Sequence, residues 1–211
     1  MAPEALLESL PLVAILRGLT PARASEVASA IYAEGIRSIE VPLNSPDPYA
    51  SIRIISDLFG DRCLCGAGTV LSADDVQRTY DAGGKLIVSP NCDADVIHAA
   101  LRLNMIAFPG IATATEAFTA VRAGARNLKL FPGATYGARH LKALKDVLPG
   151  HVNVYPVGGV GADDISEWLK AGAAGFGFGS ELFRPAYSLE EIAQRTRRVV
   201  SAYATAVKSS T

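Results

Sequence analysis

Residues 63–90 read CLCGAGTVLSADDVQRTYDAGGKLIVSP, and this stretch decides the fold. A short apolar run is followed by a polar stretch of helical character and then by a second apolar run. Ser72 precedes the acidic pair Asp74 and Asp75, which is typical of a helix N-cap with an acidic first turn. Gly83 follows the helical stretch, where a helix C-terminus favours a residue that tolerates positive φ. The stretch therefore predicts one strand–helix–strand unit.

The same unit recurs along the whole chain. Continuous apolar strands are expected when helices cover both faces of a parallel sheet. The eight predicted strands are residues 13–19, 38–43, 63–70, 86–90, 106–111, 127–132, 153–159 and 175–180. Eight such units, after an N-terminal helix at residues 3–9, predict an α/β protein: a (β/α)₈ TIM barrel with an extra N-terminal helix, in one domain spanning 1–211. A doubly wound open sheet is the alternative, because the number of strands does not show that a sheet closes.

The composition restricts the class of partner. Charged residues make up 19% of the chain and the formal net charge is −1, which argues against a nucleic-acid or membrane-surface partner. Arg195, Arg197 and Arg198 form the one local basic cluster, which we expect on a solvated helix face. No signal peptide and no apolar run of ~18 residues is visible. We therefore expect a cytoplasmic protein.

The cysteines and histidines show no metal-site pattern. Cys63 and Cys65 would point to the same face of one strand without further ligands, so core packing explains them better. An odd count of three cysteines suits a reducing compartment. The histidines fall in predicted helices or a loop without metal-ligand spacing, and they are His98, His140 and His151. We expect neither a metal nor a cofactor.

Lys129 lies inside the predicted strand NLKLFP, residues 127–132. Side chains alternate between the two faces of a strand, so Lys129 points into the barrel if Leu128 and Leu130 face the helices. A desolvated amine has a lowered pKa and becomes a nucleophile toward carbonyl groups. The alternative is a lysine that reaches solvent at the strand end.

Glu40 and Arg17 are the other charged residues in predicted strands. By the same alternation Glu40 faces inward, where a carboxylate is costly without a partner or a catalytic role. It could transfer protons next to an imine. Arg17 ends the first predicted strand and could bind a carboxylate through two parallel hydrogen bonds. The alternatives are an ion pair of Glu40 with Arg17 or Lys129, and a surface salt bridge for Arg17.

Glycines cluster at the ends of the last two predicted strands. Gly158 and Gly159 follow the seventh strand, while Gly177, Gly179 and Ser180 lie in the eighth. Barrels often bind phosphate in these two places, where glycines allow backbone N–H groups to approach the anion. Ser180 could add a hydroxyl donor. We predict a phosphate site there, with tight packing as the alternative.

Two motifs resemble those of the KDPG/KHG aldolase family. Residues 124–132 (GARNLKLFP) resemble its Schiff-base motif, and residues 35–40 (GIRSIE) are similar to the motif around its acid/base glutamate. The resemblance implies a class I aldolase of (β/α)₈ fold, forming a homotrimer, that cleaves a phosphorylated 2-keto-3-deoxy sugar acid to pyruvate and an aldehyde. It implies that Lys129 forms the imine and that Glu40 transfers protons.

The resemblance also implies roles for the remaining site residues. Arg17 would bind the carboxylate of the pyruvate part, and Thr69 would line the site near the imine. The distal phosphate would be held by Gly158, Gly159, Gly179 and Ser180.

Two positions favour the galactonate-type branch of the family. After Glu40 the chain reads VPLNSP (41–46), where gluconate-type enzymes have Thr-Leu-Arg. Val157 precedes the paired glycines, where those enzymes have a threonine that could bond to a substrate hydroxyl. We therefore expect cleavage of 2-dehydro-3-deoxy-6-phosphogalactonate to pyruvate and D-glyceraldehyde 3-phosphate. The alternatives are the gluconate epimer, a phosphate-binding barrel such as an epimerase, and a non-catalytic phosphosugar-binding barrel in which Lys129 only neutralises an anion.

Overall fold

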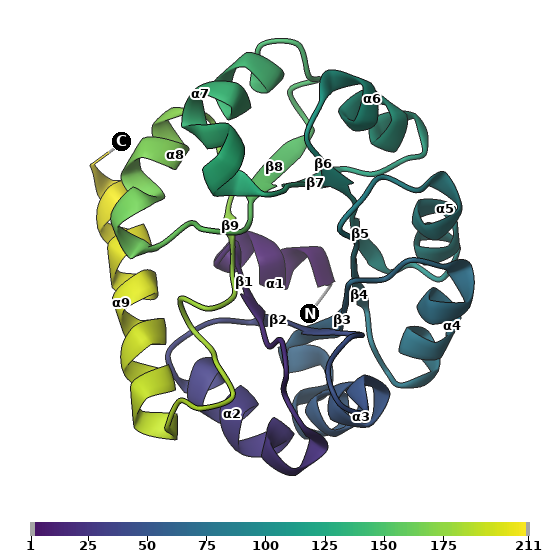
Figure 1. Ribbon diagram of the computed structural model, residues 1–211, viewed down its shortest axis with the longest axis vertical. Coiled ribbons are helices and arrows are strands. Elements are labelled where there is room, and N and C mark those ends of the chain that lie inside the picture. The colour runs from purple at the N-terminus through teal and green to yellow at the C-terminus, as the bar shows by residue number, and fades with distance from the viewer. Residues whose placement is uncertain (1–2, 210–211) are drawn as a thin grey trace.

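The computed structural model describes residues 3–209, in which parallel strands alternate with helices (Figure 1). The strands are β1 (Leu12–Ile15), β2 (Ser38–Pro42), β3 (Leu64–Gly68), β4 (Leu86–Val88), β5 (Ile106–Phe108), β6 (Gly110–Ile111), β7 (Asn127–Leu130), β8 (Asn153–Pro156) and β9 (Phe176–Phe178). The helices are α1 (Pro3–Ser9), α2 (Pro21–Ala33), α3 (Pro48–Phe59), α4 (Ala73–Asp81), α5 (Ala94–Arg102), α6 (Ala114–Arg122), α7 (Gly133–Lys145), α8 (Ile165–Lys170) and α9 (Leu189–Lys208). Two 3₁₀ turns, Gly60–Arg62 and Ala162–Asp164, precede β3 and α8.

The strands pair in two parallel sheets that curl around a common interior (Figure 1). One sheet has the order β5-β4-β3-β2-β1-β9, and the other has the order β6-β7-β8. An isolated parallel bridge between Val157 and Gly177 links the end of β8 to β9. Helices α2 to α9 lie around the outside of the strands. The predicted parallel α/β architecture is thus confirmed.

The predicted strand 106–111 is two short strands, β5 and β6, because Pro109 separates them. Proline has no N–H group and so cannot donate to a ladder. Its carbonyl still accepts a hydrogen bond of 2.9 Å from the backbone N–H of Lys129. β7 therefore stays hydrogen-bonded to this segment, although the strand is interrupted at Pro109.

The interior of the strands is closed at one end by α1. Leu6 and Leu7 of α1 are buried against Leu64, Leu86 and Ile106, which are the first residues of β3, β4 and β5. The side chains between the strands and the outer helices form a second, larger apolar layer. With the N-terminal ends of these strands covered, the opposite ends remain available for a site.

Several local predictions are confirmed. The hydroxyl of Ser72 accepts a hydrogen bond from the N–H of Asp75 and so caps α4. Gly83 has φ 85°, as the predicted helix end requires. Cys63 and Cys65 are both buried in the outer apolar layer. Within residues 3–209, no helix is both long and apolar enough to cross a membrane.

Candidate active site

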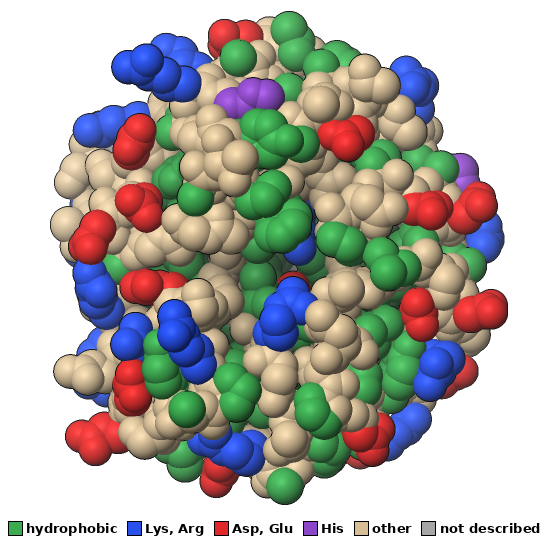
Figure 2. All heavy atoms as spheres, viewed as in Figure 1, with side chains coloured by type: hydrophobic (Ala, Val, Ile, Leu, Met, Phe, Trp, Pro, Cys, Tyr) green, Lys and Arg blue, Asp and Glu red, His purple; other side chains and the backbone are tan. Residues whose placement is uncertain are grey.

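A pocket of about 1050 Å³ opens at the C-terminal ends of β1, β7, β8 and β9. Figure 2 shows the molecule hollowed near the centre of this face, with basic side chains at the rim. The pocket lining includes Ile15, Arg17, Lys129, Phe131, Val157, Gly158, Gly159, Gly179, Ser180 and Arg184. Seven of the nine predicted site residues are therefore brought together, and the two outside this lining are Glu40 and Thr69.

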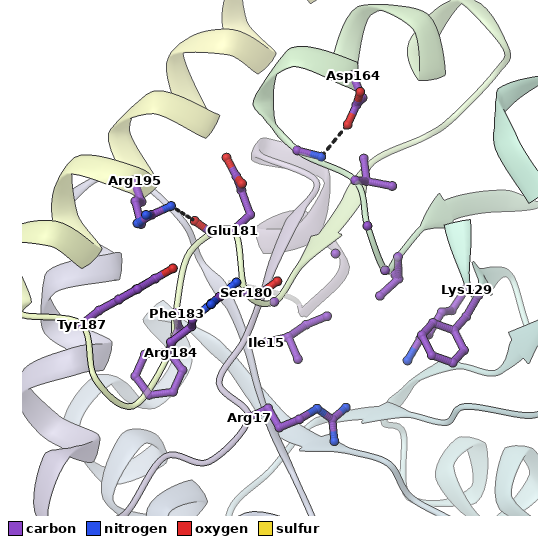
Figure 3. Close-up of a pocket in the computed structure, with 18 of the residues that line it drawn as sticks. Ile15, Arg17, Lys129, Asp164, Ser180, Glu181, Phe183, Arg184, Tyr187 and Arg195 are labelled. Atoms are coloured by element: carbon purple, nitrogen blue, oxygen red, sulfur yellow. Dashed lines mark hydrogen bonds between the residues drawn. The ribbon is translucent and has the colours of Figure 1, made fainter. Parts of the chain in front are cut away.

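Lys129 lies on the inner side of β7 and is only 5% exposed, as the alternation of its strand predicts. Its Nζ lies 4.7 Å from the centre of the Phe131 ring. Figure 3 shows its side chain and that of Arg17 in the same pocket. Burial lowers the pKa of the Lys129 ammonium, the nearby Glu40 carboxylate raises it, and the Arg17 guanidinium lowers it further. The result is an amine that loses its proton more readily than an exposed lysine.

Glu40 lies on β2 and is 2% exposed. Together with Lys129 it lines a cavity of about 10 Å³, which shares Ile15, Val157 and Gly177 with the larger pocket. Burial raises the pKa of Glu40 to about 7, although the charges of Lys129 and Arg17 oppose the change. A carboxyl group with this pKa exchanges protons readily near neutral pH.

The alternative of a structural ion pair for Glu40 is not found. Among residues 3–209, no salt bridge joins Glu40 to Lys129 or Arg17. Oε2 of Glu40 is buried without a hydrogen-bond partner in the described part of the chain. An unpartnered buried oxygen is costly, so its place beside Lys129 points to a group that receives or donates a proton during a reaction.

Arg17 lies two residues beyond the end of β1, and not in the strand as predicted. The Leu16 N–H still donates to the Glu40 carbonyl of β2, and the chain then turns, with the Leu19 N–H donating to the Leu16 carbonyl. The Arg17 Nη1 donates a hydrogen bond of 2.6 Å to Oδ1 of Asn44. The partner is a neutral amide, so the predicted alternative of a surface salt bridge is wrong. The positive charge of Arg17 stays available to an anion in the pocket.

The glycine segment after β8 brings its backbone to the pocket wall. Gly158 and Gly159 have φ values of 91° and 71°, and a Cβ on Gly159 would lie 2.6 Å from the Cβ of Ala134. In the described chain, the N–H groups of Gly159, Val160 and Ser180 donate no hydrogen bond. These donors are therefore free for an anion, as the glycine pattern predicts.

Thr69 follows β3 with φ 57°, a left-handed conformation that is uncommon for a residue other than glycine. It does not line either of the two cavities that contain Lys129. The structure therefore leaves its predicted role as an expectation from the family resemblance.

The sequence did not identify several residues that line the pocket. Arg195 was expected on a solvated face, but it lies at the pocket with its Cζ 4.4 Å from the centre of the Tyr187 ring. Arg197 and Arg198 are exposed, as predicted, and each also forms an ion pair. The pocket residues that the sequence did not identify are Phe131, Asp164, Glu181, Phe183, Arg184, Pro185, Tyr187 and Arg195, with Ile15, Val160 and Gly161. Five of these residues (Glu181, Phe183, Arg184, Pro185 and Tyr187) belong to the segment between β9 and α9, whose path cannot be read from local pattern.

The chemistry available here is that of a buried amine beside a buried carboxyl group. The amine can add to a carbonyl carbon, the carboxyl can carry a proton, and Arg17 can hold a carboxylate. No group of three or more His, Cys, Asp and Glu side chains placed to hold a metal occurs within residues 3–209.

Known proteins resemble the chain over nearly its whole length. Residues 4–197 match the KDPG and KHG aldolase family. The chain is 47% identical to 2-dehydro-3-deoxy-6-phosphogalactonate aldolase of Escherichia coli K12, covering 94% of this chain and 97% of that protein. It is 42% identical to a probable enzyme of the same name from Rhizobium meliloti, covering 92% and 91%. A solved structure described as native KDPGal superposes with a TM-score of 0.93 at 47% identity, covering 94% of this chain and 97% of that one.

Proposed function

The chain belongs to the KDPG and KHG aldolase family, and from this premise we propose that it is a class I aldolase. Its proposed substrate is 2-dehydro-3-deoxy-6-phospho-D-galactonate, and its products are pyruvate and D-glyceraldehyde 3-phosphate. The observation that carries the proposal is the meeting of Lys129 and Glu40 in one buried cavity. The relatives from Escherichia coli and Rhizobium meliloti support this substrate over its gluconate epimer.

Lys129 forms the covalent bond to the substrate. Its uncharged amine attacks the C2 carbonyl, and the carbinolamine loses water to give a protonated imine. The C3–C4 bond then breaks, and its electron pair moves toward the imine nitrogen to give an enamine. The lowered pKa of Lys129 supports this role, because more of the amine is uncharged at neutral pH.

Glu40 carries the protons. It accepts the proton of the C4 hydroxyl as the C3–C4 bond breaks, so that C4 leaves as an aldehyde. It returns a proton to C3 of the enamine, and water then hydrolyses the imine to release pyruvate. A pKa near 7 suits a group that must both take and give a proton.

The other predicted residues bind the two ends of the substrate. Arg17 holds the carboxylate of the pyruvate part, and Thr69 lines the site near the imine. The distal phosphate is held by the loops after β8 and β9, through Gly158, Gly159, Gly179 and Ser180. Val157, which is 7% exposed, forms the wall between these two ends.

We further infer that the strands close into one (β/α)₈ barrel domain with α1 as its N-terminal plug. The support is that β5 pairs with β4 while β6 pairs with β7. The short segment that contains β5 and β6 therefore connects the two sheets. The bridge between Val157 and Gly177 supplies the remaining contact. We propose a cytoplasmic homotrimer, on the family resemblance.

The proposal is tested by trapping the imine. The protein is incubated with pyruvate and borohydride, and peptide mapping locates the adduct. We expect it on Lys129 alone, with Lys129→Ala forming none and losing activity, whereas Lys142→Ala at an exposed position of α7 behaves as the wild type. Release of pyruvate from both epimers is measured in parallel. Binding of a phosphosugar without an adduct or pyruvate would instead indicate a non-catalytic binding barrel.

A further inference from the structure

Arg184 lies in the segment 179–188, which connects β9 to α9. It lines the pocket together with Gly179 and Ser180 of the same segment and with Gly158 and Gly159 of the loop after β8. Figure 3 shows Arg184 on the side of the pocket where Ser180 lies, while Arg17 enters from the segment after β1. The pocket thus has an arginine on each of two sides.

The backbone that carries Arg184 is held in place from two helices. Arg23 of α2 donates hydrogen bonds of 2.7 Å to the Pro185 carbonyl and 3.0 Å to the Tyr187 carbonyl. Arg195 of α9 packs over the Tyr187 ring. These contacts fix the residues on the C-terminal side of Arg184. A charge on a fixed segment loses less freedom when it binds a ligand.

The side chain of Arg184 itself is unpaired. In the described chain it makes no hydrogen bond or salt bridge, and its Cζ lies 5.8 Å from the centre of the Tyr187 ring. An unpaired guanidinium at a pocket wall can bind an anion without first breaking an ion pair.

The other charged side chains on this side of the pocket already have partners. Arg195 pairs with Glu191 at 3.0 Å, and Glu181 lies 3.7 Å from Arg198. Asp164 accepts a hydrogen bond of 2.8 Å from the Gly161 N–H. An incoming anion would therefore find its positive charge at Arg184.

The free backbone donors alone do not neutralise the negative charge of a phosphate. The N–H groups of Gly159, Val160 and Ser180 are neutral, whereas a phosphate monoester carries nearly two negative charges at neutral pH. A guanidinium matches phosphate oxygens with two parallel hydrogen bonds. We propose that Arg184 binds the distal phosphate of the substrate and determines the preference for phosphorylated over unphosphorylated substrates. This inference rests on the proposed aldolase function.

The test compares Arg184→Gln with the wild type on the phosphorylated substrate and on the same 2-keto-3-deoxy sugar acid without phosphate. We expect kcat/KM for the phosphorylated substrate to fall about 10- to 100-fold, as loss of a charged hydrogen bond predicts. The unphosphorylated substrate should be cleaved as by the wild type, and Arg184→Lys should fall between. Arg102→Gln removes the same charge from the exposed end of α5 and serves as the matched control.

Two further measurements separate the inference from the proposed function. Pyruvate trapping at Lys129 should proceed in Arg184→Gln at the wild-type rate, which shows that the variant is folded. Calorimetry with inorganic phosphate should show weaker binding to Arg184→Gln than to the wild type. If the wild type cleaves neither substrate, the proposed function fails, and the phosphate titration still decides the role of Arg184. Equal loss on both substrates, or unchanged phosphate binding, would overturn the inference.

Discussion

The carboxylate of Glu40 occupies the space beside Gly68, so that a Cβ atom at position 68 would overlap Oε2 of Glu40. The two residues lie on adjacent strands, where Glu40 is in register with Gly66 and Pro42 with Gly68. Glu40 makes no hydrogen bond through this oxygen in the described chain, so packing must hold its side chain in position. The buried carboxyl group of Glu40 fits at this place only because Gly68 has no side chain.

Gly68→Ala should therefore displace Glu40 and impair catalysis. We expect kcat to fall by about 10²-fold or more, because a misplaced acid/base loses most of its contribution. Stability should fall by about 1–3 kcal/mol from overpacking, measured by urea unfolding. Gly150→Ala is the control, since a Cβ there meets no atom within 4 Å. Normal activity of Gly68→Ala would show that Glu40 has room to move without loss.

The raised pKa of Glu40 predicts a pH dependence of the reaction. Glu40 must be deprotonated to accept the C4 hydroxyl proton, so kcat/KM should fall about tenfold per pH unit below about 7. The profile is measured from pH 5.5 to pH 8.5 for the wild type and for Glu40→Gln. Glu40→Gln should react about 10²–10⁴-fold more slowly than the wild type. Its pH profile should also lack the change in slope near neutral pH. A variant that keeps near-normal turnover would reduce Glu40 to a structural role.

The same pKa predicts how Glu40 affects folding. Its pKa is about 7 in the folded protein against 4.5 in the unfolded chain, so the folded state binds the proton more tightly. The stabilisation that protonated Glu40 provides is complete below pH 4.5 and is lost as the pH rises through 7. The free energy of unfolding of Glu40→Gln relative to wild type should thus rise by about 2–3 kcal/mol between pH 5 and pH 8. A difference independent of pH would contradict the raised pKa.

Asn44 should position Arg17 without neutralising it. Asn44→Ala removes the 2.6 Å hydrogen bond, and we expect KM to rise about two- to tenfold with little change in kcat. Asn44→Asp would place a carboxylate against Arg17 and compete with the substrate carboxylate, so its KM should rise further. Steady-state kinetics of the two variants measures whether KM rises more in Asn44→Asp than in Asn44→Ala. A KM of Asn44→Asp equal to that of the wild type would show that Arg17 does not bind the substrate carboxylate.

Local pattern was enough to place Lys129 and Glu40 inside the strands. Each lies in a short apolar strand whose neighbours are buried against helices, so the alternation of faces leaves one orientation. The break at Pro109 was also visible in principle, since proline interrupts a ladder.

The residues that the sequence left out depend on long-range contacts. Arg23, 161 residues before Arg184 in the chain, donates a hydrogen bond to the Pro185 carbonyl. This contact holds the segment that follows Arg184 and so keeps Arg184 at the pocket. Arg195 leaves the solvated face that its sequence pattern predicts because Tyr187 and Glu191 hold it at the pocket. The contacts with Arg23 and Tyr187 have no periodic signal. The Glu191–Arg195 pair has the i,i+4 spacing of a helix, but that spacing does not show that the pair lies at the pocket.

Val157 gives the sharpest prediction about the substrate. The galactonate and gluconate epimers differ only at C4, whose hydroxyl loses its proton during cleavage. Val157 lines both the small cavity that contains Glu40 and Lys129 and the larger pocket that the glycine loops line. A valine has no hydroxyl and so cannot favour the gluconate configuration by a hydrogen bond.

We therefore expect the galactonate epimer to be cleaved at least as well as the gluconate epimer. Val157→Thr keeps nearly the same shape and adds a hydroxyl, so it should shift the ratio of the two kcat/KM values toward gluconate. The shift should be about tenfold or less, because one neutral hydrogen bond contributes roughly 0.5–1.5 kcal/mol. Side-by-side kinetics on both epimers decides the matter. A strong gluconate preference in the native protein would contradict the substrate assignment, while an unchanged ratio in the variant would remove only the role of Val157.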